Sequence, residues 1–182
     1  NITGQGAITG INLGSTANLA TTVNVANNTI NNLSSTGTGG QVLAISCSNT
    51  STTININGNT INSLSSTGAS SAVGAITVFG ATTTNVFQNV IYDLSTSGTT
   101  APIALGIQVA GGTLVNVYRN KVYNLSASGG ALTSSASAVS GIYLSGGTTV
   151  NTFNNLIGNL TTPNINLADA IRGINIVSTS SS

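Results

Sequence analysis

The chain has 182 residues, of which three are Lys or Arg, two are Asp and none is His, so charged side chains make up only 3%. Thr, Asn, Ser and Gly account for 99 residues, and 40% of the chain is hydrophobic. Three cations are too few to neutralise a nucleic-acid backbone or to hold an anionic membrane surface, and this hydrophobic content argues against a disordered chain. No apolar run approaches the roughly 20 residues that cross a bilayer. We therefore expect neither nucleic-acid binding nor membrane insertion.

Two short segments alternate along the chain at nearly fixed spacing. The first reads Gly or Ala, Ile, any residue, then an aliphatic residue or Cys, and it is found six times. Its copies lie at 10–13, 44–47, 75–78, 106–109, 141–144 and 173–176, with successive Ile residues 34, 31, 31, 35 and 32 positions apart. Such self-similarity at a period of this length indicates a repeat protein.

The second segment follows each of the first five copies. It begins with a Thr, and three residues later has an Asn that is followed by a Leu after nine more residues in every copy; these Asn are Asn24, Asn55, Asn85, Asn116 and Asn151. Apolar and polar residues alternate with period two, as in Val23-Asn24-Val25, and no stretch has the 3.6-residue period of a helix. We therefore predict about three short strands per repeat, joined by loops rich in Ser, Thr, Gly and Ala.

A single repeat buries too few aliphatic residues to offset the entropy of ordering it, so we predict that the repeats stack and form columns of equivalent residues. Six Ile residues should form one interior column, with Cys47 in the next: Ile11, Ile45, Ile76, Ile107, Ile142 and Ile174. The second Asn of each repeat should form a ladder of amides at a corner with positive φ: Asn28, Asn59, Asn89, Asn120 and Asn155. The Gly or Ala before each Ile should mark a tight place at a strand start.

Segments 106–109, 116–120 and 121–125 read Gly-Ile-Gln-Val, Asn-Val-Tyr-Arg-Asn and Lys-Val-Tyr-Asn-Leu, and they resemble repeats of right-handed parallel β-helices. More narrowly, the sequence is similar to the repeat arrays of very large secreted, adhesin-like bacterial cell-surface proteins. The prediction is an all-β, right-handed parallel β-helix (β-solenoid) with about five to six rungs of roughly 31–35 residues, as one array over residues 1–182. The resemblance implies an extracellular or cell-surface location.

The repeat pattern continues to both ends of the chain, and no charged or amphipathic helical segment covers a terminal strand. Because a bare strand edge pairs with another strand, we expect either a segment of a longer array or copies that stack head to tail into a filament. The leading interpretation is a structural or adhesive extracellular fibre component that associates with itself, end to end or laterally.

Aromatic residues offer an alternative function. By alternation, five of them should point outward in two columns, Phe87, Tyr118 and Phe153 in one and Tyr92 and Tyr123 in the other. Such columns are covered by the chain's own loops, pack against a neighbouring fibre, or bind surface glycans. The sequence therefore leaves open a carbohydrate-binding surface module.

Aligned Thr residues raise ice binding as a third alternative. Thr21, Thr52, Thr82, Thr113 and Thr148 align between repeats. A flat ice-binding lattice needs two Thr separated by one residue on the same face, and no pair of columns repeats that pattern. Thr at strand starts explains the alignment without a ligand.

Catalysis is not expected. Asp93 and Asp169 fall in different columns of non-adjacent repeats, which does not suit the paired carboxylates of a glycosidase. Because His and Glu are absent, neither a Ser-His-Asp triad nor the usual zinc sites can be assembled. We expect no cofactor and no metal, and we expect Asp93 to form a weak surface pair with Arg119 or Lys121.

Overall fold

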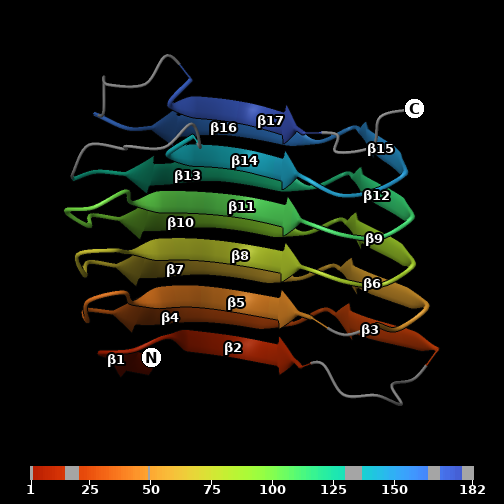
Figure 1. Ribbon diagram of the computed structural model, residues 1–182, viewed down its shortest axis with the longest axis horizontal. Helices are drawn as coiled ribbons and strands as arrows, with labels where there is room; N and C mark the ends of the chain where they lie inside the picture. The colour runs from red at the N-terminus through yellow and green to blue at the C-terminus, as the bar shows by residue number, and fades with distance from the viewer. Residues whose placement is uncertain (1, 15–20, 49, 130–136, 164–168, 178–182) are drawn as a thin grey trace.

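The computed structural model describes residues 2–14, 21–48, 50–129, 137–163 and 169–177. The described chain is an all-β parallel solenoid of about five turns, in which each full turn contributes one strand to each of three parallel sheets. Figure 1 shows the turns stacked on one another from the N-terminal to the C-terminal end. The predicted β-solenoid with three short strands per rung is confirmed.

The strands of the three sheets follow one another in chain order around each turn. Sheet A, the first, holds β1 (Ile2–Gly4), β4 (Thr29–Ser35), β7 (Thr60–Ser66), β10 (Val90–Thr96), β13 (Lys121–Ala127) and β16 (Leu156–Thr161). Sheet B holds β2 (Ile8–Leu13), β5 (Gln41–Cys47), β8 (Ala72–Val78), β11 (Ile103–Val109), β14 (Val139–Leu144) and β17 (Ile171–Ile176). Sheet C holds β3 (Thr22–Ala26), β6 (Thr53–Asn57), β9 (Thr83–Phe87), β12 (Leu114–Tyr118) and β15 (Thr149–Phe153).

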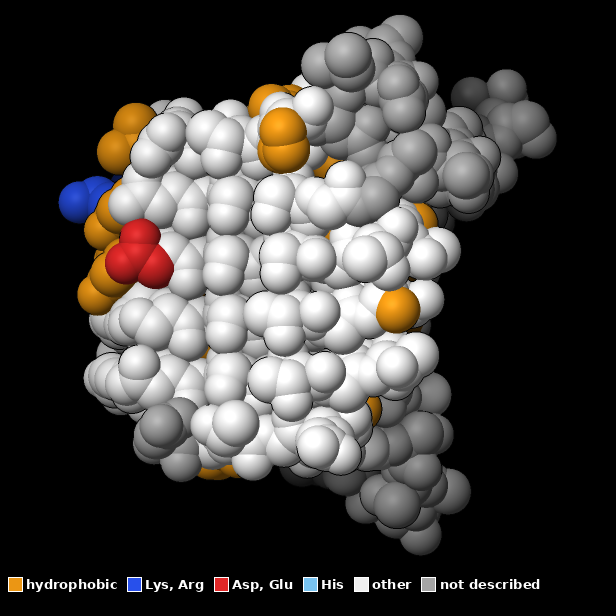
Figure 2. Space-filling model, turned by 90° about the vertical axis from the view of Figure 1, so that its left-hand side faces the viewer, with side chains coloured by type: hydrophobic (Ala, Val, Ile, Leu, Met, Phe, Trp, Pro, Cys, Tyr) orange, Lys and Arg blue, Asp and Glu red, His pale blue; other side chains and the backbone are white. Residues whose placement is uncertain are grey.

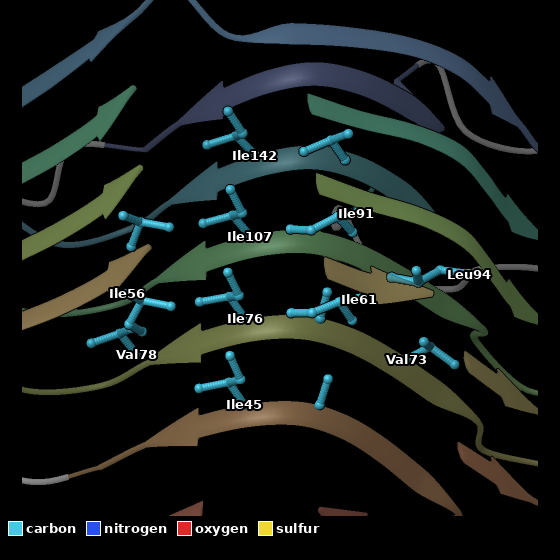
Figure 3. Packing of buried hydrophobic residues seen from close by; sticks show 14 of the residues in the cluster. Ile45, Ile56, Ile61, Val73, Ile76, Val78, Ile91, Leu94, Ile107 and Ile142 are labelled. Atoms are coloured by element: carbon cyan, nitrogen blue, oxygen red, sulfur yellow. The ribbon is translucent and has the colours of Figure 1, made fainter. Parts of the chain in front are cut away.

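The core is built from columns of aliphatic side chains along the axis. In sheet B, Ile45 pairs in register with Ile76, and the same column continues through Ile107 and Ile142, all four fully buried. Figure 3 shows these residues stacked one above the other and facing the side chains of sheet A. Cys47 is buried in the adjacent column, between Leu13 and Val78. Identical neighbours pack with matching shapes, so the repeat itself produces the close packing.

Each strand of sheet B breaks the alternation once, and this break explains the column of small residues. In β11 both Gly106 and Ile107 are buried, so two consecutive residues face inward. A Cβ added at Gly106 would lie 2.4 Å from the carbonyl oxygen of Gly141 and 2.5 Å from Cγ1 of Val122. The tight place that we predicted is confirmed, but it lies within the strand and not at its start.

The corner between sheets C and A also differs from the prediction. The residues with positive φ are those just before the Asn ladder, namely Asn27, Gly58, Gln88, Arg119 and Asn154. None of the ladder residues from Asn28 to Asn155 has positive φ, so the expectation that the ladder itself occupies the left-handed conformation is wrong. A second column with positive φ bends sheet A, at Asn32, Ser63, Asp93, Asn124 and Asn159.

Candidate functional site

A buried ladder of asparagine side chains runs along the corner that leads into sheet A. Asn59 is representative: its Nδ2 donates to Oδ1 of Asn89 at 2.9 Å and to the carbonyl oxygen of Val25 at 2.9 Å. Its Oδ1 accepts from both the backbone N–H and the Nδ2 of Asn28, each at 3.0 Å. The same pattern continues through Asn120 to Asn155. Backbone partners fix each amide, so the ladder joins successive turns by side-chain and backbone groups together.

A second asparagine ladder lies on the outer face of sheet C and was not predicted. Nδ2 of Asn55 donates to Oδ1 of Asn24 at 2.8 Å, and Asn85, Asn116 and Asn151 continue the chain of bonds at 2.8 to 2.9 Å. The alignment of these residues in the sequence carried the signal, because outward Asn side chains in register are close enough to pair. Solvent competes for these bonds, so they contribute less than those of the buried ladder.

The last turn exposes residues whose equivalents are buried elsewhere. Ile174 continues the column of Ile45 and Ile142, yet 45% of its surface is exposed, whereas Ile142 is fully buried. Ile171 and Ile176, on the same strand β17, are 42% and 50% exposed. At the other end Ile11 is half-buried although it packs on the core. The two end faces of the described solenoid are therefore apolar in the interior and polar at the rim.

The predicted aromatic residues do come together, but with their rings stacked on each other. Phe87, Tyr118 and Phe153 pair in register, with ring centroids 5.0 Å apart and interplanar angles of 1° and 4°. Tyr92 and Tyr123 stack at 5.2 Å and 4°. Successive rings cover each other's faces, so the column presents mainly ring edges to solvent. A sugar that stacks on an aromatic face finds that face occupied within the column.

Most of the charged side chains lie in sheet A or just before it. Asp93, Arg119 and Lys121 are three of the five charged residues of the chain. Oδ1 of Asp93 accepts a hydrogen bond from Nδ2 of Asn124 at 3.0 Å. In the described part of the chain the one ion pair joins Arg172 to Asp169, so the expected pair between Asp93 and a neighbouring cation is wrong.

The carboxylates and the thiol lie apart. Asp93 is on sheet A, and Asp169 precedes β17 of sheet B and contacts Arg172. Over the described ranges no cluster of three or more His, Cys, Asp or Glu side chains is suited to hold a metal. Burial raises the pKa of the Cys47 thiol from 9.0 to about 12, which makes this thiol a poor nucleophile at neutral pH.

The Thr columns do not form the pair of parallel rows on one face that an ice-binding lattice needs. Thr22, Thr53 and Thr83 pair in register at the start of sheet C, but Leu114 interrupts the column before Thr149. Two residues further along each strand the outward column is the Asn ladder and not a second rank of Thr. The outer face of sheet C therefore offers a mixed Thr and Asn surface.

Comparison with family models, with curated proteins and with solved structures gives no match. A search of the described residues finds no helix with the length and hydrophobicity to span a membrane.

Proposed function

We propose that the protein is a structural or adhesive component of an extracellular fibre, built by end-to-end stacking of solenoid turns. The observation that carries this proposal is the apolar interior of the last turn, where Ile171, Ile174 and Ile176 are each at least 42% exposed. Inside the solenoid the equivalent residues are covered by the next turn, so another turn of the same pattern is the surface that fits them. Exposed apolar area of this kind favours association.

The register of the strands defines the joint, that is, the contact between the last turn of one copy and the first turn of the next. A second copy placed on the last turn sets its β2 on β17 and its β1 on β16, which continues sheets B and A in parallel. Its Ile11 then lies over Ile174, and Ile8 over Ile171, as in the internal pairs. Sheet C has five described strands against six in the others, so a complete joint requires one more strand on β15.

The low charge of the solenoid's outer walls is consistent with a neutral fibre. Figure 2 shows one wall as regular rows of mostly uncharged polar side chains, with an acidic and a basic side chain at one edge beside several hydrophobic ones. With a net charge of +1 over 182 residues, copies repel one another little. The extracellular location rests on the resemblance of the repeats to secreted bacterial cell-surface arrays.

Negative-stain microscopy and light scattering of the purified chain test the proposal. We expect filaments or concentration-dependent oligomers. Ile174→Asp places a charge in the joint and should shift the protein to monomers, while the matched Ser126→Asp, on the outer face of sheet A, should leave assembly unchanged. Circular dichroism establishes that both variants stay folded. Compact monomers of the unmodified chain at all concentrations would refute the proposal.

Carbohydrate binding by the aromatic column is the alternative, and the structure gives it less support because the rings stack on each other. Phe153, at one end of its column, is 49% exposed, and its outer ring face is a place within that column where a sugar can stack. A glycan array with the unmodified chain and with Phe153→Ala separates the two functions. Binding that Phe153→Ala abolishes would favour the alternative.

A further inference from the structure

A hollow of about 320 Å³ lies on the outer wall of sheet B, over the last three turns. Two outward columns form its floor, one of Leu105, Ser140 and Arg172 and the other of Gln108, Tyr143 and Asn175. In the earlier turns the position of Tyr143 is held by Thr77, Ser46 and Asn12. Within this column of described residues, the aromatic ring of Tyr143 and the longer amide of Gln108 therefore occur only where the hollow forms.

The polar side chains of the second column lack partners, unlike those of the asparagine ladders. Elsewhere in the solenoid, stacked amides on successive turns bond to each other at 2.8 to 3.0 Å. Within the described residues, the side chains of Gln108, Tyr143 and Asn175 form no hydrogen bond to the protein. Two amides and a phenol around one hollow offer several donors and acceptors together with one aromatic ring.

The ion pair between Arg172 and Asp169 indicates which class of ligand the hollow suits. Nη2 of Arg172 lies 3.2 Å from Oδ2 of Asp169, so the single cation of the hollow is already neutralised. An anionic ligand has to compete with Asp169 for the guanidinium, and a cationic one finds no unpaired carboxylate. A neutral polyhydroxylated ligand can use donors and acceptors together while its apolar face packs on Tyr143.

We propose that this hollow binds a neutral saccharide of about one or two sugar rings, a size that suits a cavity at the low end of the range for ligand sites. Ser140, buried and bonded to Ser137 at 2.7 Å, fixes the floor. The site is on the side wall, so it does not require that copies stack. Failure of the protein to form filaments leaves this inference intact, and absence of sugar binding leaves the fibre proposal intact.

Saturation-transfer NMR of the full chain tests the site, with methyl glycosides of glucose, galactose, mannose and N-acetylglucosamine, their β-linked disaccharides, and glucuronic and N-acetylneuraminic acids as charged comparators. We expect transfer to at least one neutral sugar. Tyr143→Ala should weaken binding about tenfold or more, since it removes the packing face. Gln108→Ala provides a second variant in case Tyr143→Ala does not fold.

The matched control is Phe79→Ala, which removes an aromatic residue that is 50% exposed and lies outside the hollow. Binding to a neutral sugar that Phe79→Ala preserves, and that Tyr143→Ala or Gln108→Ala weakens, supports the inference. No transfer to any neutral sugar, transfer to the acidic sugars alone, or binding that neither variant of the hollow changes would overturn it.

Discussion

The buried asparagine ladder gives the sharpest test of what holds the turns together. Asn89 is fully buried, and its Nδ2 donates to Oδ1 of Asn120 at 3.0 Å and to the carbonyl oxygens of Ile56 at 2.9 Å and Phe87 at 3.1 Å. Its Oδ1 accepts from the backbone N–H and Nδ2 of Asn59, at 3.0 and 2.9 Å. Asn89→Ala removes all five bonds.

The expected loss follows from the burial of these groups. A typical hydrogen bond contributes about 1 kcal/mol net, and a buried donor without a partner costs about 1–3 kcal/mol. The backbone N–H of Asn59 loses its acceptor, whereas Asn120 still accepts from the backbone N–H of residue 89 at 3.1 Å. We therefore expect Asn89→Ala to lower the free energy of unfolding by about 3–5 kcal/mol.

Asn85→Ala is the matched control, because it removes the same side chain from the outer ladder in the same turn. The Asn85 amide makes two side-chain bonds, to Asn55 and from Asn116, both at 2.8 Å. Its groups are partly exposed, so water replaces the lost partners. We expect a loss below about 1 kcal/mol.

Urea unfolding followed by far-UV circular dichroism and by tyrosine fluorescence measures both variants. Coincident transitions are required, because stacked repeats need not unfold in two states. Equal destabilisation by Asn89→Ala and Asn85→Ala would refute the assignment of the buried ladder as the stronger link between turns.

Three further measurements address the core. Thr84→Val should stabilise the fold by about 1 kcal/mol or more, since the buried Thr84 hydroxyl has no hydrogen-bond partner, and Thr83→Val, at a half-buried position, should change little in urea unfolding. Burial raises the pKa of the Cys47 thiol to about 12 in the folded state, so unfolding above pH 9 releases a proton. The free energy of unfolding should therefore fall as the pH rises from 9 to 12, and Cys47→Val should remove that part of the fall. Gly106→Ala should lower the thermal midpoint by several degrees through its clash at 2.4 Å, whereas Gly158→Ala, with nothing within 4 Å, should not.

The repeat spacing was sufficient to predict the fold. Nine residues separate Asn55 from Leu64 in one turn and Asn116 from Leu125 in another, and this constancy fixed which residues share a column. Alternation then predicted the inward and outward faces of sheet C correctly, because its strands are regular. Such strands keep the period of two that the rule assumes.

Alternation failed where the backbone departs from a regular strand. Asp93 has a φ of 57°, so two consecutive residues of β10, Tyr92 and Asp93, both face outward. This bend shifts the residues after it and places Asp93 beside Asn124 and not beside a cation. Four of the five residues in this column are Asn or Asp, the types that tolerate positive φ best, so the residue types carried a signal for the bend that alternation alone does not use.

The hollow on sheet B also escaped prediction, for a different reason. Most of its residues come from β11, β14 and β17, and Gln108 and Arg172 are 64 positions apart in the chain. Their proximity depends on the register of three turns whose loops differ in length. A column becomes visible in the sequence when its members are alike, and the column of Gln108, Tyr143 and Asn175 is mixed.

The two asparagine ladders differ in direction, and this difference bears on how copies join. In the buried ladder each Nδ2 donates toward the C-terminal end, from Asn28 to Asn59, whereas in the outer ladder Asn55 donates toward the N-terminal end, to Asn24. Turning every outer amide over would reverse that ladder without loss of a bond. The buried amides cannot turn over, because Oδ1 accepts from a backbone N–H and Nδ2 donates to a backbone carbonyl. The described series therefore has a donor end at Asn155 and an acceptor end at Asn28. Because Ile2 pairs with Leu33, a second copy joined through β1 and β16 sets its own Asn28 two turns beyond Asn155, so the ladder continues across the joint only if the intervening turn supplies another Asn with the same polarity.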